Sequence, residues 1–358
     1  MKKIIAFLIL LFPLGVKAID TSATSAILMD TDNQRILYSK NIHNVRSVAS
    51  ISKIMTATLA IESGKLDEVV TVDSTIDDAY GSAIYIKVGE KLTLRDLVYG
   101  LMLRSGNDAA LMIAKYVGGS VDNFVDMMNN KANEIGMKES KFNNPSGLDQ
   151  DLEKGNFSSA YDMAVLTSYA MKLEEYKTIT STKKYTLKTN KNNYVWNNKN
   201  KLLKRYKYAT GGKTGFTKIA KRTLVTTASK DDINLVVVTL NDGNDFKDHM
   251  DLFEYAFDNY TSYKILKKGV IQVYDDKIYE DHNLYIKNDF NYLISNEEKN
   301  SVTLKYQLNK DNHITKTGSI GKIIVKLGDK NIHEEWIYAK AKNKSKKSII
   351  KRIGDLFK

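Results

Sequence analysis

Three short motifs follow one another along the chain, and they constrain its fold more than any other feature. They are Ser50-Ile51-Ser52-Lys53, Ser105-Gly106-Asn107 and Lys213-Thr214-Gly215. Together they supply a serine with a lysine one helical turn away, a second serine beside an asparagine, and a lysine on a strand. Segments far apart in the sequence have to meet if these side chains form one site.

Two of the motifs recur, so the setting of each copy must select the functional one. S-x-x-K occurs again at Ser181–Lys184 and Ser348–Lys351. Ser50 opens an apolar helix expected to run to about Ser63, so its N–H belongs to the electropositive helix end. Lys53 lies three residues further on the same face. Burial favours a neutral lysine amine, which can take a serine proton, whereas the other copies lack such a setting.

The other two motifs are less decisive alone. Ser105-Gly106-Asn107 falls in a break between two predicted helices, where side chains can face a cleft. Taken alone, that break is better interpreted as a simple turn with a capping residue. Lys213-Thr214-Gly215 begins a predicted strand whose glycine permits close backbone approach. The second K-T-G, at Lys316–Gly318, lies among short strands and is interpreted as a turn.

The periodicity of apolar residues predicts an α+β fold with an antiparallel sheet, because strands at both ends enclose a helical middle. Strands are expected at 22–29, 35–39, 212–217, 223–229 and 233–240, and helices at 50–63, 93–104, 108–117, 123–135, 159–172 and 249–259. After about Tyr260 only short alternating runs remain, which predicts a separate small β domain. We therefore expect a catalytic domain at 19–260, a β-sandwich-like domain at 261–340 and a tail at 341–358.

The first 18 residues have the pattern of a secretory signal. Lys2 and Lys3 precede an apolar run from Ile4 to Leu14, and Val16-Lys17-Ala18 fits a cleavage site. A membrane-spanning anchor is the alternative, but the run is well short of the roughly 20 residues that span a bilayer. The sequence thus predicts an exported protein.

The net charge of +12 is concentrated near the C-terminus, where residues 342–358 hold six lysines and one arginine against Asp355. The body of the chain is only weakly basic, which disfavours a nucleic-acid surface. One helical face of the tail is apolar and is formed by Ile349, Ile350, Ile353, Leu356 and Phe357. Residues 345–358 are therefore predicted to lie in an anionic membrane surface, the alternatives being a solvated end or a helix packed on its own domain.

The chain contains no cysteine, which excludes disulfides, cysteine nucleophiles and thiolate metal sites. Its five histidines are scattered and form no metal-binding pattern. We expect neither a metal nor a cofactor, and a lysine-based mechanism suits the sequence better than a histidine-based triad.

The three motifs together resemble those of the low-molecular-mass penicillin-binding proteins, which are serine-type D-alanyl-D-alanine carboxypeptidases of the peptidase S11 family. The resemblance runs from about Thr21 to the C-terminus and includes further stretches: Arg46–Ala49, Ile54–Thr56, Asn144–Leu148, Ser159–Ala164 and Arg222–Val225. It implies a β-lactamase-like catalytic domain with a helical cluster, a small all-β domain and an amphipathic C-terminal helix. Ser146 stands where the family often has histidine.

The resemblance implies how the reaction would begin. Ser50 would attack the carbonyl between the two terminal D-alanines of a peptidoglycan stem peptide, with Lys53 as general base. Backbone N–H groups of Ser50 and Phe216 would form the oxyanion hole. β-Lactams would acylate the same serine. The enzyme would act at the outer face of the cytoplasmic membrane, attached by its tail.

The resemblance also implies how the substrate is held. Ser105 would relay a proton to the leaving D-alanine, supported by Lys213, and Asn107 would hold a substrate amide. The strand Lys213-Thr214-Gly215 would bind the substrate, with Thr214 and Lys213 receiving its terminal carboxylate.

Three alternatives remain open. A serine β-lactamase shares the acylation machinery, and Glu139-x-x-x-Asn143 imitates the deacylating glutamate motif of class A enzymes. The small β domain and the tail argue against it. A catalytically inactive cell-wall-binding homologue is disfavoured by the intact motifs, and a transpeptidase would usually bring a different accessory architecture.

Overall fold

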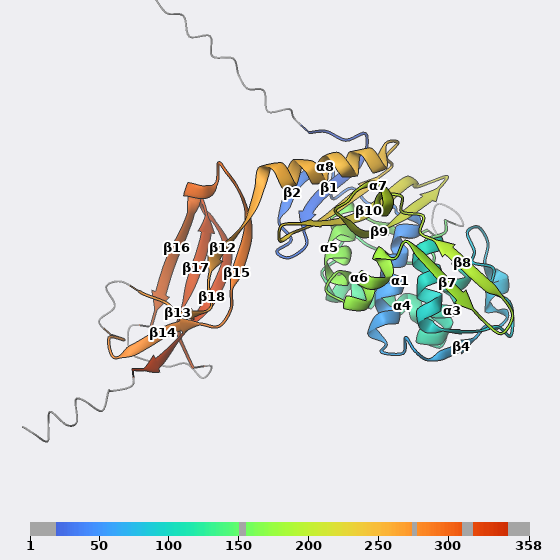
Figure 1. Ribbon diagram of the computed structural model, residues 1–358, viewed down its shortest axis with the longest axis horizontal. Helices are drawn as coiled ribbons and strands as arrows, with labels where there is room; N and C mark the ends of the chain where they lie inside the picture. Colours follow the sequence, from blue (N-terminus) through green and yellow to red (C-terminus); the bar gives the residue numbers. More distant parts are fainter. Residues whose placement is uncertain (1–18, 150–154, 274–277, 310–317, 343–358) are drawn as a thin grey trace, which may run out of the picture. The chain divides into compact units, whose positions relative to one another are not determined.

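The computed structural model describes residues 19–149, 155–273, 278–309 and 318–342 (Figure 1). The chain divides into two compact units, Met1–Ser229 with Asn234–Ala256 and Lys230–Ile233 with Phe257–Lys358. Within the described residues, no helix is long and apolar enough to cross a bilayer. The predicted signal peptide, the tail from residue 343 onward, Ser348–Lys351, and Lys316 and Thr317 of the second K-T-G lie outside the described residues.

A five-stranded sheet organises the first unit, in the order β2-β1-β11-β10-β9. Its strands are β1 (Ser25–Asp30), β2 (Ile36–Lys40), β9 (Ala209–Thr217), β10 (Lys221–Lys230) and β11 (Ile233–Leu240). β1 pairs antiparallel with both β2 and β11, and β9 pairs antiparallel with β10. The predicted α+β class with an antiparallel sheet is confirmed, and the sheet unites the two ends of the unit.

Helices cover both faces of this sheet (Figure 1). The α-helices described are α1 (Lys53–Glu62), α2 (Leu94–Tyr99), α3 (Asn107–Gly118), α4 (Val121–Glu134), α5 (Ala160–Ala170), α6 (Glu174–Ser181), α7 (Leu202–Arg205) and α8 (Asp245–Asn259), not all of which contact the sheet. Ile27, Val225 and Val236 of the sheet share one apolar core with α1, α3 and α5. α8 packs on the other face, where His249 contacts the Thr226 and Thr239 hydroxyls at 2.5 and 3.0 Å.

α1 is the central helix of the first unit. Every residue from Lys53 to Ala60 is buried, and the only charged side chain among them is Lys53. A helix that is apolar around its circumference has to be enclosed by other elements. The burial of α1 therefore places the lysine of the first motif inside the protein.

The helix predicted at 93–104 has two parts. Thr93 and Asp96 form the predicted capping box at its start. The α-helical part ends at Tyr99, and a π-helical turn, Gly100–Arg104, carries the chain to Ser105. Such π-turns are frequent at functional sites because they shift the direction of the side chains that follow.

Several short elements complete the first unit. They are the 3-10 turns η1 (Ala49–Ser52) and η2 (Ser74–Asp78), and the strand pairs β3 (Arg46–Ser47) with β6 (Phe157–Ser158), β4 (Val69–Thr71) with β5 (Lys91–Thr93), and β7 (Lys184–Lys188) with β8 (Asn193–Asn197). The helices α6 and α7 and the β7–β8 hairpin were not predicted from the sequence. The hairpin is held by stacked rings, including Tyr185 on Tyr99 at 3.8 Å between centroids.

From Tyr260 onward the described residues of the second unit are all-β apart from the 3-10 turn η4 (Lys299–Ser301), as predicted. One sheet has the order β13-β14-β18-β17-β16, and β12 pairs with β15. The strands are β12 (Tyr260–Leu266), β13 (Gly269–Val270), β14 (His282–Ile286), β15 (Phe290–Ser295), β16 (Val302–Leu308), β17 (Ser319–Leu327) and β18 (Lys330–Ala341). Phe290 and Ile294 of the pair share a core with Ile323, Val325 and Ile337 of the sheet.

Candidate active site

Ser50 lies in the 3-10 turn η1 immediately before α1. The preceding residue, Ala49, has a φ of 50°, which is uncommon for a residue with a Cβ. Such backbone conformations persist where the surrounding structure fixes them, and they cluster at functional sites. Ser50 itself is half-buried, between the fully buried Ala49 and Ile51. The turn thus presents one hydroxyl from an otherwise buried segment.

Lys53 is fully buried and has three polar neighbours. Its Nζ lies 3.1 Å from Ser50 Oγ and 2.7 Å from Asn107 Oδ1, and it donates a hydrogen bond to the Ser146 carbonyl. Burial, and then the positive charges of Lys213 and Lys199, hold the pKa of the Lys53 amine well below its ordinary value. A neutral amine has two N–H groups and one lone pair. Asn107 and Ser146 can take the two hydrogens, which leaves the lone pair for Ser50.

The Ser146 contact uses only the main chain. The carbonyl oxygen accepts from Lys53, while the Ser146 hydroxyl donates to Asn144 Oδ1 at 3.1 Å. The departure from the family pattern at this position therefore leaves the contact with Lys53 in place.

Ser105 occupies the break between the π-turn and α3. Its backbone is left-handed, with φ 65° and ψ 34°, and its side chain is buried. Lys213 Nζ donates to Ser105 Oγ at 3.1 Å and to the Thr214 carbonyl at 2.7 Å. Burial, followed by the charge of Lys199, lowers the pKa of Lys213 to about 7. The second and third motifs are thus joined by a direct hydrogen bond.

Asn107 links the second motif to the first. Its Oδ1 faces Lys53, and its Nδ2 donates to the Tyr80 carbonyl at 2.6 Å. The predicted role for Asn107 was to hold a substrate amide. The side chain keeps one N–H and one lone pair for that purpose, but its first partner in this structure is Lys53.

Strand β9 packs directly against the turn that carries Ser50. A Cβ added to Gly215 would lie 3.1 Å from the Ser50 backbone nitrogen and would also collide with Thr223 Oγ1. Glycine at this position lets the strand approach the nucleophile. Phe216 follows and is 64% exposed. Ser50 and Phe216 line the same cavity, which is the setting that the predicted oxyanion hole requires.

Four residues of the three motifs, Ser50, Ser105, Thr214 and Gly215, line a cleft of about 330 Å³. Its lining residues are Ser50, Ser82, Ser105, Lys199, Lys201, Thr214, Gly215, Phe216, Arg222, Asp245 and Phe246. Neither the two lysines, Lys199 and Lys201, nor the ion pair between Arg222 Nη2 and Asp245 Oδ1, at 2.7 Å, was expected from the sequence. Three cationic side chains beside the nucleophile suit a substrate that ends in a carboxylate.

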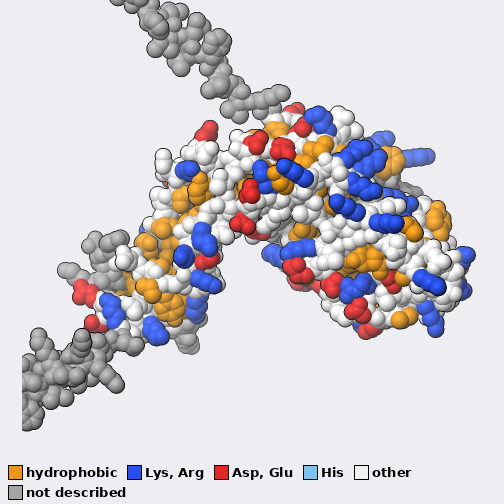
Figure 2. All heavy atoms as spheres, viewed as in Figure 1, with side chains coloured by type: hydrophobic (Ala, Val, Ile, Leu, Met, Phe, Trp, Pro, Cys, Tyr) orange, Lys and Arg blue, Asp and Glu red, His pale blue; other side chains and the backbone are white. Residues whose placement is uncertain are grey.

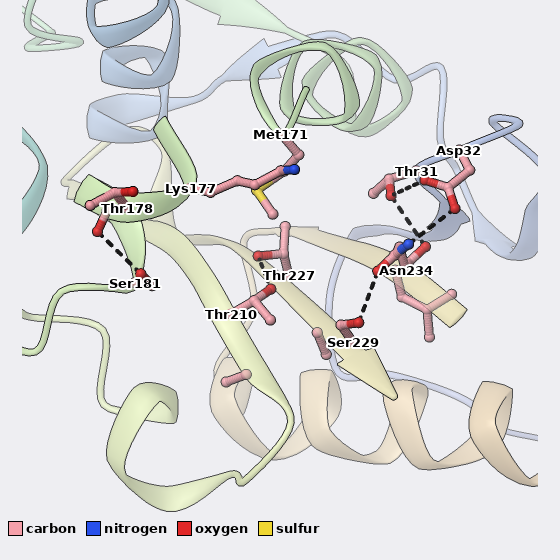
Figure 3. Close-up of a pocket in the computed structure, with 13 residues that line it drawn as sticks. Thr31, Asp32, Met171, Lys177, Thr178, Ser181, Thr210, Thr227, Ser229 and Asn234 are labelled. Carbon is pink, nitrogen blue, oxygen red and sulfur yellow. Dashed lines mark hydrogen bonds between the residues drawn. The ribbon is translucent and has the colours of Figure 1, made fainter. Parts of the chain in front are cut away.

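A larger hollow in the same unit contains no residue of the three motifs that meet at Ser50. It measures about 540 Å³ and lies between the α5–α6 segment and the sheet (Figure 3). Thr210 of β9 and Thr227 of β10 share a hydrogen bond of 2.8 Å at its centre. Cavity volume does not identify the active site in this unit, because the nucleophile Ser50 and the cations Lys199, Lys201 and Arg222 line the smaller cleft.

The competing motif copies lack comparable surroundings. Ser181 ends α6 and its hydroxyl donates to the Thr178 carbonyl, while Lys184 begins β7. Glu139, the residue that would suit a β-lactamase, pairs with His43 at 3.0 Å. Asn143 of the same pattern donates to the Gly155 carbonyl. Among the described residues, no group of three or more His, Cys, Asp or Glu side chains could hold a metal.

The fold and the convergent motifs define the class of penicillin-binding proteins. A family model described as D-alanyl-D-alanine carboxypeptidase matches residues 14–244, and one described as the C-terminal domain of penicillin-binding protein 5 matches residues 260–345. The chain belongs to the D-alanyl-D-alanine carboxypeptidase family, peptidase S11.

Individual relatives agree with this placement. The chain is 34% identical to D-alanyl-D-alanine carboxypeptidase DacF of Bacillus subtilis over 69% of its length and 65% of that protein. It is 30% identical to DacD of Escherichia coli over 94% of its length and 90% of that protein. Penicillin-binding protein 5 of Haemophilus influenzae has a similar structure, with a TM-score of 0.77 and 27% identity over 91% of this chain and 99% of that one.

Proposed function

We propose that this carboxypeptidase removes the terminal D-alanine from peptidoglycan stem peptides through an acyl-enzyme on Ser50. The observation that carries the proposal is the 3.1 Å contact between Ser50 Oγ and the buried Lys53 Nζ. A hydroxyl is a weak nucleophile unless a base removes its proton, and a desolvated lysine amine is such a base.

Acylation begins when the neutral Lys53 amine takes the proton from Ser50 Oγ. The oxygen attacks the carbonyl carbon between the two D-alanines, and negative charge moves to the carbonyl oxygen. The backbone N–H groups of Ser50 and Phe216 stabilise that charge. Losing one such donor typically costs about 10²–10³ in rate.

The second step expels D-alanine. Ser105 relays to the leaving nitrogen the proton that Lys53 took from Ser50, giving its own hydroxyl proton and receiving that of Lys53. The protonated form of Lys213, hydrogen-bonded to Ser105 Oγ at 3.1 Å, favours this relay. The C–N bond breaks as the nitrogen gains its proton, which leaves an ester on Ser50. Water then attacks the ester and releases the shortened peptide.

Substrate binding uses the motif residues and the cations of the cleft. Asn107 holds a backbone amide of the stem peptide, and Thr214 and Lys213 receive the terminal carboxylate. Lys199 and Arg222 line the same cleft and add to its positive charge. No metal or cofactor takes part. β-Lactams acylate Ser50 because their ring amide occupies the place of the D-alanyl-D-alanine bond.

The location of the enzyme is part of the proposal. Residues 1–18 direct export, and the basic amphipathic segment 345–358 attaches the protein to the outer face of the cytoplasmic membrane. The sequence pattern supports both statements.

The test compares wild type with Ser50→Ala, and Ser181→Ala serves as a matched control because Ser181 begins another S-x-x-K. The measurements are D-alanine release from diacetyl-Lys-D-Ala-D-Ala and the lifetime of the penicillin adduct. We expect D-alanine release and a slowly hydrolysed adduct, both lost in Ser50→Ala and retained in Ser181→Ala. Rapid penicillin hydrolysis without peptide cleavage would instead identify a β-lactamase. Failure of wild type on both substrates would indicate a binding protein.

A further inference from the structure

One face of the five-stranded sheet in the second unit is turned away from the apolar core. Strand residues alternate between the two faces, and Ile323, Val325 and Ile337 occupy the core side. The intervening positions therefore form the outer face. Cross-strand pairs place Lys322 beside Trp336, Lys326 beside Thr303, and Tyr285 beside Tyr338 on it.

This outer face combines lysines with aromatic rings, and we call it the lysine–aromatic face. Its strand residues include Tyr285, Lys305, Lys322, Lys326, Trp336, Tyr338 and Lys340. Lys287, which follows β14, joins them because its amine lies over the Tyr338 ring. Glu334 lies on the same face and forms an ion pair with Lys322 at 2.8 Å. Figure 2 shows apolar and cationic side chains together on this unit. Five lysines against one glutamate give the face a clear positive charge.

The aromatic side chains on this face are not there to fill the core. Trp336 is 55% exposed, although tryptophan is usually well covered in a soluble protein. Tyr285 and Tyr338 stack at 5.6 Å between centroids, and the Lys287 amine lies 3.7 Å from the centre of the Tyr338 ring. Exposed Trp and Tyr beside lysine amines are typical of surfaces that meet a lipid–water boundary, where rings enter the interface and amines contact headgroups.

We propose that the lysine–aromatic face docks on an anionic phospholipid bilayer, as a contact separate from the amphipathic tail. Charge complementarity selects the partner, since clustered lysines are attracted to the negative potential of such a surface. Chain continuity supports the same partner. β18 carries Trp336, Tyr338 and Lys340 and ends at Ala341, directly before the segment with six lysines and one arginine.

The docking goes beyond the proposed catalytic function and does not depend on it. An isolated basic tail would hold the protein at a membrane by a single tether. A second contact on the folded unit adds attraction and restricts the rotation of that unit.

The experiment uses the full chain, anionic vesicles of phosphatidylglycerol and phosphatidylcholine, and neutral vesicles of phosphatidylcholine alone. The face variant is Lys305→Gln/Lys322→Gln/Lys326→Gln. The control variant, Lys264→Gln/Lys267→Gln/Lys299→Gln, removes the same charge from positions outside the five-stranded sheet of this unit. We expect the face variant to lose about tenfold or more in affinity for anionic vesicles, because each lysine near such a surface contributes to binding. The control variant should bind like wild type.

Trp336 provides an independent readout. The only other tryptophan, Trp196, is 4% exposed, so quenching of emission by brominated lipid reports on Trp336. We expect quenching on anionic vesicles that is lost in Trp336→Phe. D-Alanine release from soluble peptide should be unchanged in every variant, which shows that the catalytic unit is unaffected, and an unchanged circular dichroism spectrum shows that the substituted β unit is folded.

Three outcomes would overturn the proposal. The first is equal binding by the face and control variants. The second is vesicle binding without quenching of Trp336, which would mean that the tail alone makes the contact. The third is face-dependent binding to soluble polyphosphate with no face-dependent binding to vesicles, which would assign the face to a soluble polyanion.

Discussion

Asn107 Oδ1 lies 2.7 Å from Lys53 Nζ, although the two residues are 54 positions apart in the sequence. The contact fixes one hydrogen of the amine and thereby orients its lone pair. An uncharged acceptor also leaves the pKa of Lys53 low, where a carboxylate at the same distance would raise it. The proximity of these residues therefore bears on the protonation state of the base.

Asn107→Asp tests this relationship with a side chain of the same shape. The added negative charge favours the protonated lysine, so the pKa of Lys53 rises and the neutral base becomes scarcer. We expect penicillin acylation at pH 7 to fall by about 10²-fold or more and to recover partly as the pH rises. Asn143→Asp is the control, because the side-chain hydrogen bond of Asn143 goes to the Gly155 carbonyl and not to Lys53. Equal loss at every pH would contradict the explanation.

Lys199 is predicted to set the working pH of the site. Its positive charge lowers the pKa of both Lys53 and Lys213. Removing that charge in Lys199→Gln raises the pKa values of both lysines. The pH at which the acylation rate rises should therefore increase by up to about one unit. Lys201→Gln removes a charge from the same cleft, but Lys201 is not among the charges that lower the pKa of Lys53. In this variant the acylation rate should rise at the same pH as in wild type. Stopped-flow acylation across pH distinguishes the two variants.

Lys213→Met is expected to lower the catalytic activity and to raise the free energy of unfolding. The pKa of Lys213 in the folded protein is about 7, below its ordinary value near 10.5, because burial disfavours the charged amine. The unfolded chain holds that proton more tightly, so stability is reduced most below pH 7 and the reduction fades as the pH rises toward 10.5.

At pH 6 the methionine variant should therefore gain on the order of 2 kcal/mol, which raises Tm by roughly 4–8 °C, and the gain should shrink at pH 9. Its D-alanine release should be severely reduced. Lys184→Met changes an exposed lysine and should show no such pH dependence. Calorimetry at the two pH values is the measurement, and a gain that grows with pH would refute the argument.

Gly147→Ala should damage both folding and catalysis. Gly147 has a φ of +73°, and a Cβ there would collide with the Ala49 carbonyl and the Ser52 hydroxyl, on either side of the nucleophile. Gly64 has a φ of +72° but nothing within 4 Å, so Gly64→Ala reports the cost of the backbone conformation alone. We expect about 1 kcal/mol for Gly64→Ala and about 3 kcal/mol or more for Gly147→Ala, with slower acylation only in the latter. Urea unfolding and acylation rates provide the comparison, and similar costs for the two variants would exclude the collision.

The local features of the sequence predicted the fold class and the order of most elements. The capping box at Thr93 and Asp96 formed as expected, because a cap depends only on residues three apart. The prediction of a single helix from Thr93 to about Arg104 was wrong in part, since the α-helix stops at Tyr99 and a π-turn follows. The β7–β8 hairpin was missed, because what holds it is stacking of Tyr185 on Tyr99, a contact 86 residues away along the chain.

The sequence by itself determined which residue types are available and which lie one turn apart. Ser50 and Lys53 are adjacent because helical geometry requires it, whatever the rest of the chain does. The tertiary structure alone decided that Lys53 is fully buried, that Asn107 and Ser146 take its hydrogens, and that Lys199 and Arg222 surround the cleft. The physical reason is that desolvation and charge–charge interaction depend on distances through space, which packing sets and sequence spacing does not.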